Sequence, residues 1–307
     1  MFIFLVLMIL GLCGCSETLA ETVTYADRET DPSLPKGTRD NEAVVLIPDK
    51  TGEILSCPSC DIDLGGMKDG YFSAFYHGEC SKVKLQVTGP DGVTYTYDIR
   101  PGQKEILPFS AGNGKYTVGV YENIEGTAYS VALSEETDVD IESEFGPFLY
   151  PNMYCMFDGN TSFVGKSEDL AYPVNSDLEL VTNIFNYVIK NMTYDKEKAE
   201  TVESGYVCNL DETYKSMKGI CLDFSAVMTC MLRAQGIPTK LDVGYAGKAY
   251  HAWISTYIKD VGWVNGIIEF DGENWSLMDP TFSASSGTDE LASFIGDGTN
   301  YTVKYVY

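Results

Sequence analysis

The sequence predicts an α+β protein, with an N-terminal antiparallel β-sandwich and a C-terminal part in which helices precede an antiparallel sheet. Its 307 residues, of which 44% are hydrophobic, supply enough apolar side chains for one large or two ordinary domains. Between residues 43 and 140, apolar and polar residues alternate between tight turns spaced about 8–12 residues apart, which is typical of a sandwich. Beyond residue 142 the apolar spacing becomes helical, and strand-like runs follow the helices.

The strands of the sandwich are predicted by period-two alternation. Val83, Leu85 and Val87 alternate with polar residues, residues 89–92 (Gly-Pro-Asp-Gly) turn the chain, and residues 93–99 alternate back. Residues 71–77 also form a strand-like run, and further alternating runs lie at residues 116–120 and 129–133. Nothing in this module resembles a reaction centre, so we expect it to act as a spacer or to bind a partner.

Helices and strands of the second part are bounded by capping and stop signals. Ser176 and Glu179 form a capping box, and the apolar spacing that follows predicts a helix that ends near Asn191. A second helix is expected from Ile220 to Ala234, ended by Gly236. The strands expected after it, which we predict to form one contiguous antiparallel sheet, lie near residues 240–245, 249–258, 267–270 and 276–278.

The N-terminus carries the features of an export signal. The apolar run from Phe2 to Leu12 is too short, at about 1.5 Å per residue, to cross a hydrocarbon core of roughly 30 Å. It fits the apolar region of a signal peptide, although no Lys or Arg precedes it. Residues 12–15 (Leu-Cys-Gly-Cys) resemble a bacterial lipobox, which implies lipidation of Cys15; the alternative is an apolar terminus that is merely trimmed.

These signals divide the chain into four expected segments. Residues 1–15 are the lipoprotein signal peptide, residues 16–42 a disordered tether, residues 43–140 the β-sandwich-like module, and residues 141–307 the α+β domain. The tether is rich in Glu, Thr, Asp and Pro and has few apolar residues to bury. We therefore expect the protein at the outer face of a bacterial cytoplasmic membrane, held by its lipid.

The charge balance excludes one class of partner. The chain has 21 basic and 45 acidic residues, a net charge of −24, and such an excess of carboxylates repels nucleic-acid phosphates. No calcium-binding loop of the D-x-[DN]-x-[DN]-G type occurs, so the carboxylates are expected to form a solvated surface. We predict no cofactor and no nucleic-acid partner.

One cysteine-rich pattern lies in the first module. Cys57 and Cys60 form a CxxC pair, and His77 and Cys80 follow as HxxC, which together match the ligand types of a structural zinc site. Export favours instead a disulfide that involves Cys80 or the CxxC pair. Unpaired thiols, as in a strictly anaerobic habitat, are the third alternative, and the sequence leaves all three open.

Three motifs in the second part carry the chemistry. Cys221 lies in the first turn of a predicted helix, directly after Gly219-Ile220; His251 lies in a predicted strand, within Tyr-His-Ala-Trp; and Asp279 ends a strand before a proline. In this chain order they resemble the Cys, His and Asp of the transglutaminase-like superfamily, whose core is related to papain. The resemblance covers roughly residues 178–282, and the whole arrangement is similar to surface lipoproteins of anaerobic Gram-positive bacteria.

The chemistry of these three groups can also be argued from the residues. A helix N-terminus and a neighbouring imidazolium both stabilise a thiolate, so Cys221 is the expected nucleophile and His251 the base and later the acid. Asp279 would orient the imidazole, unless it only caps a turn. Strand alternation places His251 on the face opposite Ala252, and we expect that face to be exposed. The Cys221 N–H is one oxyanion donor; three weak candidates for the second are Tyr194, Tyr206 and Tyr214.

The expected activity is thiol attack on amide bonds of peptides, proteins or cell-wall peptides through a thioester. Water or an amine completes the reaction, and the three residues do not distinguish hydrolysis from transamidation. The alternative interpretation of Cys221 is that it is an inert, buried helix cysteine that only contributes to packing, as we expect Cys230 to be. At the level of the whole chain the alternative is a non-catalytic surface binding lipoprotein that reuses this fold.

Overall fold

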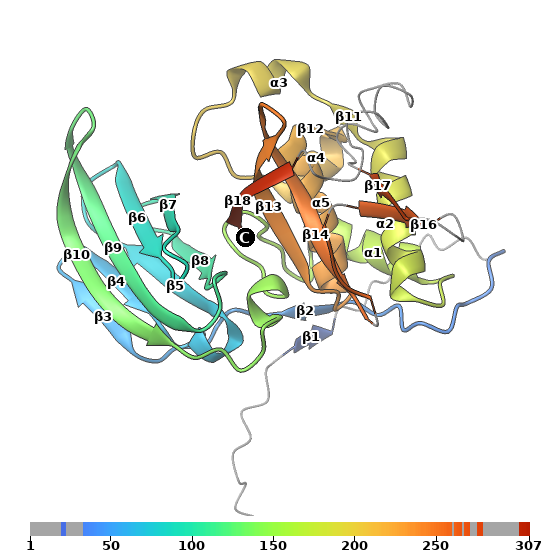
Figure 1. Cartoon of the computed structure of the whole chain (residues 1–307), viewed down its shortest axis with the longest axis horizontal. Coiled ribbons are helices and arrows are strands. Elements are labelled where there is room, and N and C mark those ends of the chain that lie inside the picture. Colours follow the sequence, from blue (N-terminus) through green and yellow to red (C-terminus); the bar gives the residue numbers. More distant parts are fainter. Residues whose placement is uncertain (1–19, 23–32, 260, 266, 271–274, 279–300) are drawn as a thin grey trace, which may run out of the picture.

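The computed structural model describes residues 20–22, 33–259, 261–265, 267–270, 275–278 and 301–307. A β-rich module comes first along the chain, and a mixed part that contains all five α-helices assigned among the described residues follows it. In Figure 1 the two parts lie side by side, with the C-terminus between them. No helix in this described portion combines the length and the apolarity needed to cross a bilayer.

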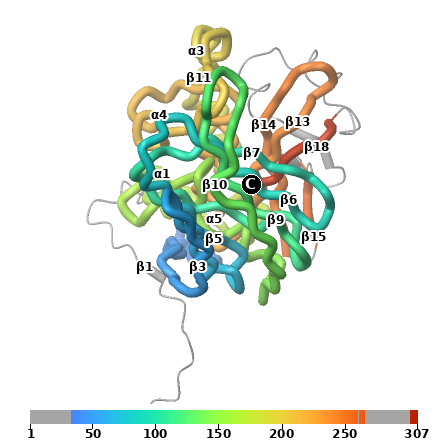
Figure 2. The backbone as a smooth tube through the Cα atoms, turned by 90° about the vertical axis from the view of Figure 1, so that its left-hand side faces the viewer, coloured from blue at the N-terminus to red at the C-terminus, as the bar shows by residue number. Residues whose placement is uncertain are grey.

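The β-rich module is a sandwich of two four-stranded antiparallel sheets, as the sequence predicts. One sheet has the strand order β10-β9-β6-β7 and the other the order β3-β4-β5-β8. Figure 2 shows this module facing the viewer. The strands are β3 (Ile54–Cys57), β4 (Cys60–Asp63), β5 (Tyr71–Tyr76), β6 (Val83–Thr88), β7 (Thr94–Ile99), β8 (Lys104–Pro108), β9 (Gly114–Glu125) and β10 (Ala128–Val139).

The alternation read from the sequence determines which side chains fill the sandwich. In β6 every second residue is buried, and Leu85 is 0% exposed. Phe72 and Leu107 of one sheet and Val118 and Val120 of the other are also 0% exposed and belong to the same cluster as Leu85. Their burial is the hydrophobic driving force that holds the two sheets together.

The segment expected to be a disordered tether is ordered where the structure describes it. β1 (Ala20–Thr22) pairs with β2 (Val44–Leu46). Arg39 forms an ion pair of 2.7 Å with Asp177 and donates to the side chain of Gln235. The prediction of a tether over residues 16–42 is therefore wrong for these parts. The composition lacked apolar residues, but hydrogen bonds of Gly37, Thr38 and Arg39 attach the segment to the mixed part.

Both helices predicted for the second part are present, and three further helices were not predicted. Ser176 accepts from the backbone N–H of Glu179, and the side chain of Glu179 accepts from the N–H of Asn175, one residue before the position that a strict capping box predicts. The helices are α1 (Ser162–Ala171), α2 (Asp177–Asn191), α3 (Lys196–Thr201), α4 (Leu210–Ser216) and α5 (Cys221–Ala234). α5 is the central helix, since every residue from Asp223 to Ala234 is buried.

The sheet of the second part is antiparallel, as predicted, but its strands differ from the predicted set. Its order is β15-β14-β13-β18, and β18 (Tyr301–Val306) was not predicted. Two predicted strands, β16 (Ile267–Phe270) and β17 (Trp275–Met278), form a separate hairpin. The prediction of one contiguous sheet is wrong because it assumed that strands adjacent in sequence are adjacent in the sheet. The other strands are β11 (Thr193–Tyr194), β12 (Lys218–Gly219), β13 (Thr239–Ala246), β14 (Ala249–Ile258) and β15 (Gly262–Asn265).

A cluster of tyrosine rings joins the two parts. Tyr97 of β7 lies 6.0 Å from Tyr307, and Tyr307 lies 4.1 Å from Tyr154, measured between ring centroids. The buried Arg233 of α5 holds this end of the chain, since its guanidinium donates to the carbonyl of Tyr307 at 2.9 Å. The two parts thus share one continuous apolar cluster, and β7, an edge strand of the sandwich, faces the mixed part.

Candidate active site

Cys221 is the first residue of α5, in the position that the sequence predicted. The backbone N–H groups in the first turn of a helix have no partner within the helix and point toward an anion placed there. The side chain of Cys221 is partly exposed, unlike the rest of its helix. The preceding Gly219 is needed for space, because an added Cβ would lie 2.4 Å from the Cβ of Asp223. Its φ is not positive, so the position needs a small residue and not the left-handed backbone conformation.

A buried carboxylate organises the start of this helix. Asp223 is 0% exposed and accepts the backbone N–H of Ile220 at 2.8 Å. It also accepts from Nζ of Lys198 at 2.8 Å and from Oη of Tyr206 at 2.5 Å. Lys198 lies in α3 and Tyr206 in the loop after it, so one carboxylate ties both segments to the turn that carries the thiol. Asp223 is therefore a buried residue of the helix start.

His251 lies on β14 as predicted, but the face that carries it is not exposed. His251 is 6% exposed, and Trp253 and Ser255 on the same face are 4% and 2% exposed. The ring of His251 lies 6.2 Å from that of Trp253 and 6.4 Å from that of Tyr301. The expectation of an exposed face is therefore wrong. β14 is a central strand, and rings on this side of the sheet cover the histidine.

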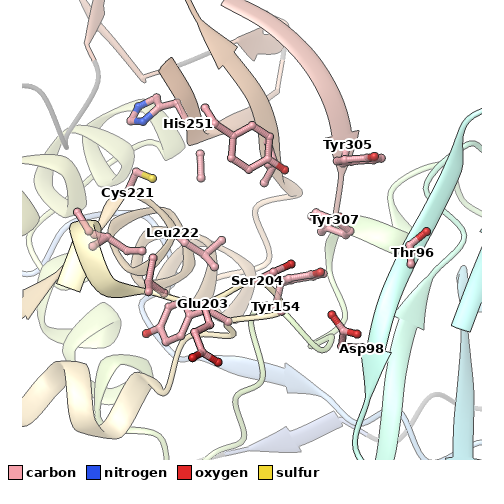
Figure 3. Close-up of a pocket in the computed structure, with 18 of the residues that line it drawn as sticks. Thr96, Asp98, Tyr154, Glu203, Ser204, Cys221, Leu222, His251, Tyr305 and Tyr307 are labelled. Atoms are coloured by element: carbon pink, nitrogen blue, oxygen red, sulfur yellow. The ribbon is translucent and has the colours of Figure 1, made fainter. Parts of the chain in front are cut away.

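Cys221 and His251 line the same cleft, which has a volume of about 630 Å³. This size is within the usual range for small-ligand sites. Figure 3 shows the two side chains at one end of the cleft and Thr96 and Asp98 of β7 at the other. The cleft is lined by Lys84, Thr96, Asp98, Tyr154, Tyr194, Ala199, Val202, Glu203, Ser204, Gly205, Tyr206, Ile220, Cys221, Leu222, Val243, Tyr250, His251, Ala252, Tyr305 and Tyr307.

The three tyrosines considered as oxyanion donors differ in where they lie. Tyr194 lines the cleft with Cys221, and burial together with the charge of the Cys221 thiolate raises the pKa of its phenol, so the phenol keeps its proton. Tyr206 also lines the cleft, but its hydroxyl donates to Asp223. Tyr214 is not among the lining residues and packs against Phe163. Of the three, Tyr194 is therefore the one that lines the cleft without donating to Asp223.

The sequence analysis did not predict that the sandwich forms one wall of this cleft. Lys84 and Asp98 are directly opposite on β6 and β7 and form an ion pair of 2.6 Å. Gly205 of the loop after α3 approaches them, since a Cβ added there would lie 2.7 Å from Oδ2 of Asp98. The pairing of Lys84 with Asp98 could be read from the predicted hairpin. That the pair faces the thiol could not, because it depends on how the two parts pack.

Two predicted site residues fall outside what the structure describes. Asp279, expected to orient the imidazole, lies in the stretch 279–300, and Cys15, expected to carry lipid, lies in the stretch 1–19.

The remaining cysteines of the mixed part are buried: Cys230 is 0% exposed, Cys155 is 1% exposed and Cys208 is 8% exposed. Burial raises the pKa of each of these thiols, so all three are poor nucleophiles. The interpretation of Cys230 as a packing residue is confirmed.

The cysteine-rich pattern of the sandwich is not arranged as a zinc site. Among the described residues no group of three or more His, Cys, Asp or Glu is placed to hold a metal ion. Nε2 of His77 lies 3.5 Å from Asp61, and the Cys80 thiol donates to the carbonyl of Lys82. Cys57 and Cys60 lie beside each other, with their sulfurs 2.8 Å apart, and neither is in a disulfide.

Comparison with known proteins shows which family a segment of the mixed part matches. A family model described as the transglutaminase-like superfamily matches residues 167–266. This range includes Cys221 and His251 and ends before Asp279. Residues 167–266 are thus a transglutaminase-like domain, and the chain has the α+β fold that its sequence predicted.

Individual proteins are similar over part of the chain. The UPF0252 protein MJ1282 of Methanocaldococcus jannaschii is 29% identical over 115 residues, which cover 33% of this chain and 33% of that protein. The uncharacterized protein YebA of Bacillus subtilis is 26% identical over 103 residues, 28% of this chain and 13% of that protein. The chain therefore spans a third or less of the length of these curated relatives.

Two solved structures illustrate the similarity of the chain trace. The periplasmic domain of TgpA from Pseudomonas aeruginosa has a TM-score of 0.32 and 16% identity, and the similarity covers 89% of this chain and 95% of that chain. Red sea bream transglutaminase has a TM-score of 0.31 and 14% identity, with 71% of this chain and 49% of that chain covered.

Proposed function

We propose that this protein is a thiol enzyme that acts on amide bonds of peptides or proteins. The observation that carries the proposal is that Cys221, at the start of α5, and His251, on β14, line one cleft. A helix start provides the stabilisation that a thiolate needs, and the imidazole provides a proton acceptor and donor. The transglutaminase-like domain over residues 167–266 supports the same chemistry.

The proposed reaction begins with attack of the Cys221 sulfur on the amide carbonyl. The N–H of Cys221 and the hydroxyl of Tyr194 donate to the oxyanion, His251 protonates the leaving amine, and a thioester forms. Water or a second amine, deprotonated by His251, then attacks the thioester and releases the thiolate. Asp279 is proposed to accept the other imidazole N–H and so to hold the reactive tautomer.

The experiment compares the full-length wild type with Cys221→Ala under reducing conditions. Each protein is incubated with a glutamine-rich unfolded protein and a labelled primary amine, and the products are read by mass spectrometry. Label on glutamine in the wild type alone identifies a transamidase, and deamidated glutamine or cleaved peptide bonds identify a hydrolase. Loss of the nucleophile should reduce turnover by about 10⁴–10⁶-fold.

The matched control is Cys80→Ala, which removes a partly exposed thiol that does not line the cleft. It should keep the activity of the wild type. Activity that survives Cys221→Ala would contradict the assignment of the nucleophile. A protein with no activity on unfolded proteins or on cell-wall peptides, and whose Cys221 does not react with iodoacetamide, would instead be a non-catalytic binding module.

We further propose that the protein is held at the bacterial cell surface by a lipid on Cys15. The support is the apolar run that ends at the Leu-Cys-Gly-Cys motif. Detergent-phase partitioning of the wild type, lost in Cys15→Ala with release of the protein into the medium, is the expected result. Continued partitioning of Cys15→Ala into detergent would contradict the anchor.

A further inference from the structure

Two cysteines outside the cleft lie in contact in a tight hairpin. Cys57 ends β3 and Cys60 begins β4, and they are directly opposite in the antiparallel register across a two-residue turn. Their sulfur atoms are 2.8 Å apart, and both cysteines are free. The proposed amide chemistry uses neither of them, since neither lines the cleft.

The two thiols have different surroundings. Cys57 is partly exposed, whereas Cys60 is 1% exposed. Partial burial works against ionisation of Cys57, but hydrogen bonds with the Cys60 thiol and with Ser59 outweigh it, so the pKa of Cys57 is lowered. Burial, and then the hydrogen bond with Cys57 and its negative charge, raise the pKa of Cys60. One thiol is therefore accessible and ionises first, while the other is shielded and keeps its proton.

The neighbouring cysteine does not compete for this pairing. Cys80 donates its S–H to the carbonyls of Lys82 at 3.3 Å and Asn123 at 3.6 Å. A disulfide bond is about 2.0 Å long, so the sulfurs of Cys57 and Cys60 need to approach by less than about 1 Å to form one. The geometry thus selects Cys57 and Cys60 among the three thiols of the sandwich.

We propose that Cys57 and Cys60 form a thiol–disulfide exchange site that is oxidised by small-molecule disulfides. The Cys57 thiolate attacks one sulfur of the disulfide, the S–S bond breaks, and one small thiolate leaves. Cys60 gives its proton to that thiolate and attacks the Cys57 sulfur, which releases the second small thiolate to take a proton from water. The protein dithiol loses two electrons, and the disulfide is reduced to two thiols.

The test uses the full-length protein with Cys221→Ala, so that the proposed nucleophile does not consume the reagent. The protein is equilibrated with reduced and oxidised glutathione at graded ratios, quenched with acid, alkylated with N-ethylmaleimide and mapped by peptide mass spectrometry. Cys60→Ser in the same background traps the first step, and Cys80→Ser is the matched control. The titration without the second substitution does not depend on whether Cys60→Ser or Cys80→Ser folds.

The expected result is a disulfide between Cys57 and Cys60 that Cys80→Ser leaves unchanged. In Cys60→Ser, glutathione should accumulate on Cys57 at a level at least about tenfold above that on Cys80. Three results would overturn the proposal: a disulfide that includes Cys80, glutathione distributed equally over the thiols, or a pair that stays reduced at every glutathione ratio. Because the readout is the redox state of the sandwich, it is independent of any activity at Cys221.

Discussion

Replacement of Tyr206 with Phe tests whether the buried carboxylate of Asp223 holds the wall of the cleft. The substitution removes one donor, 2.5 Å from Oδ1 of Asp223, and keeps the ring. A hydrogen bond to a charged group contributes about 1.5–3 kcal/mol. Because Asp223 is 0% exposed, water cannot easily replace the lost donor, whereas Ile220 and Lys198 still donate. We therefore expect the free energy of unfolding to fall by about 2 kcal/mol.

Equilibrium urea unfolding measures this loss, with Tyr245→Phe as the matched control, since Tyr245 is 42% exposed and does not line the cleft. The control should change stability by less than about 0.5 kcal/mol. Tyr206→Phe should also raise KM, because the loop that carries Tyr206 lines the cleft.

A double-mutant cycle with Lys198→Met sharpens the test. Lys198 and Tyr206 donate to the same carboxylate, so their effects should be non-additive by about 0.5–3 kcal/mol. The reasoning is refuted if Tyr206→Phe is no more destabilising than Tyr245→Phe, or if the effects of Tyr206→Phe and Lys198→Met simply add.

Three further predictions concern the site and its supporting sheet. Tyr194→Phe should lower kcat by about 10²-fold with little change in KM, since it removes an oxyanion donor, and an unchanged kcat would exclude that role. Asp98→Asn should raise KM for a peptide by roughly fivefold, which corresponds to a loss of about 1 kcal/mol of binding free energy. The control Glu136→Gln, in an exposed ion pair away from the cleft, should leave KM unchanged. Burial raises the pKa of Asp242 to about 6 from 3.8, so its contribution to stability is complete below pH 4 and is lost as the pH rises to about 6. Over that pH range the free energy of unfolding of the wild type should fall by about 3 kcal/mol relative to that of Asp242→Asn. The measurement is urea unfolding as a function of pH, and parallel profiles for the two proteins would contradict the prediction.

Local signals in the sequence were enough for several elements. Ser176 caps α2, the alternation at Val83–Val87 buries one face of β6, and Cys221 begins α5. Each of these depends on residues within a few positions of one another. The same local reasoning placed His251 on a strand, because β-branched and aromatic residues surround it.

Several of the failures involve contacts between residues distant in sequence. β18 joins the sheet at its edge beside β13, and Arg39 attaches a polar segment to Asp177 and Gln235. Both pairings span long stretches of chain, so neither leaves a periodic signal in a local window. The same holds for the burial of His251, which depends on what covers its strand.

The sequence by itself determined the α+β class and several of the elements, and it singled out Cys221 as the candidate nucleophile, since periodicity and capping are local properties. Only the tertiary structure decided what surrounds the thiol. It placed Lys84 and Asp98 of the sandwich at the far end of the cleft, and it buried Asp223 where two donors from a separate segment meet it. The physical reason is that burial and electrostatic environment depend on how distant surfaces pack, and packing chooses among many arrangements that the same local pattern allows.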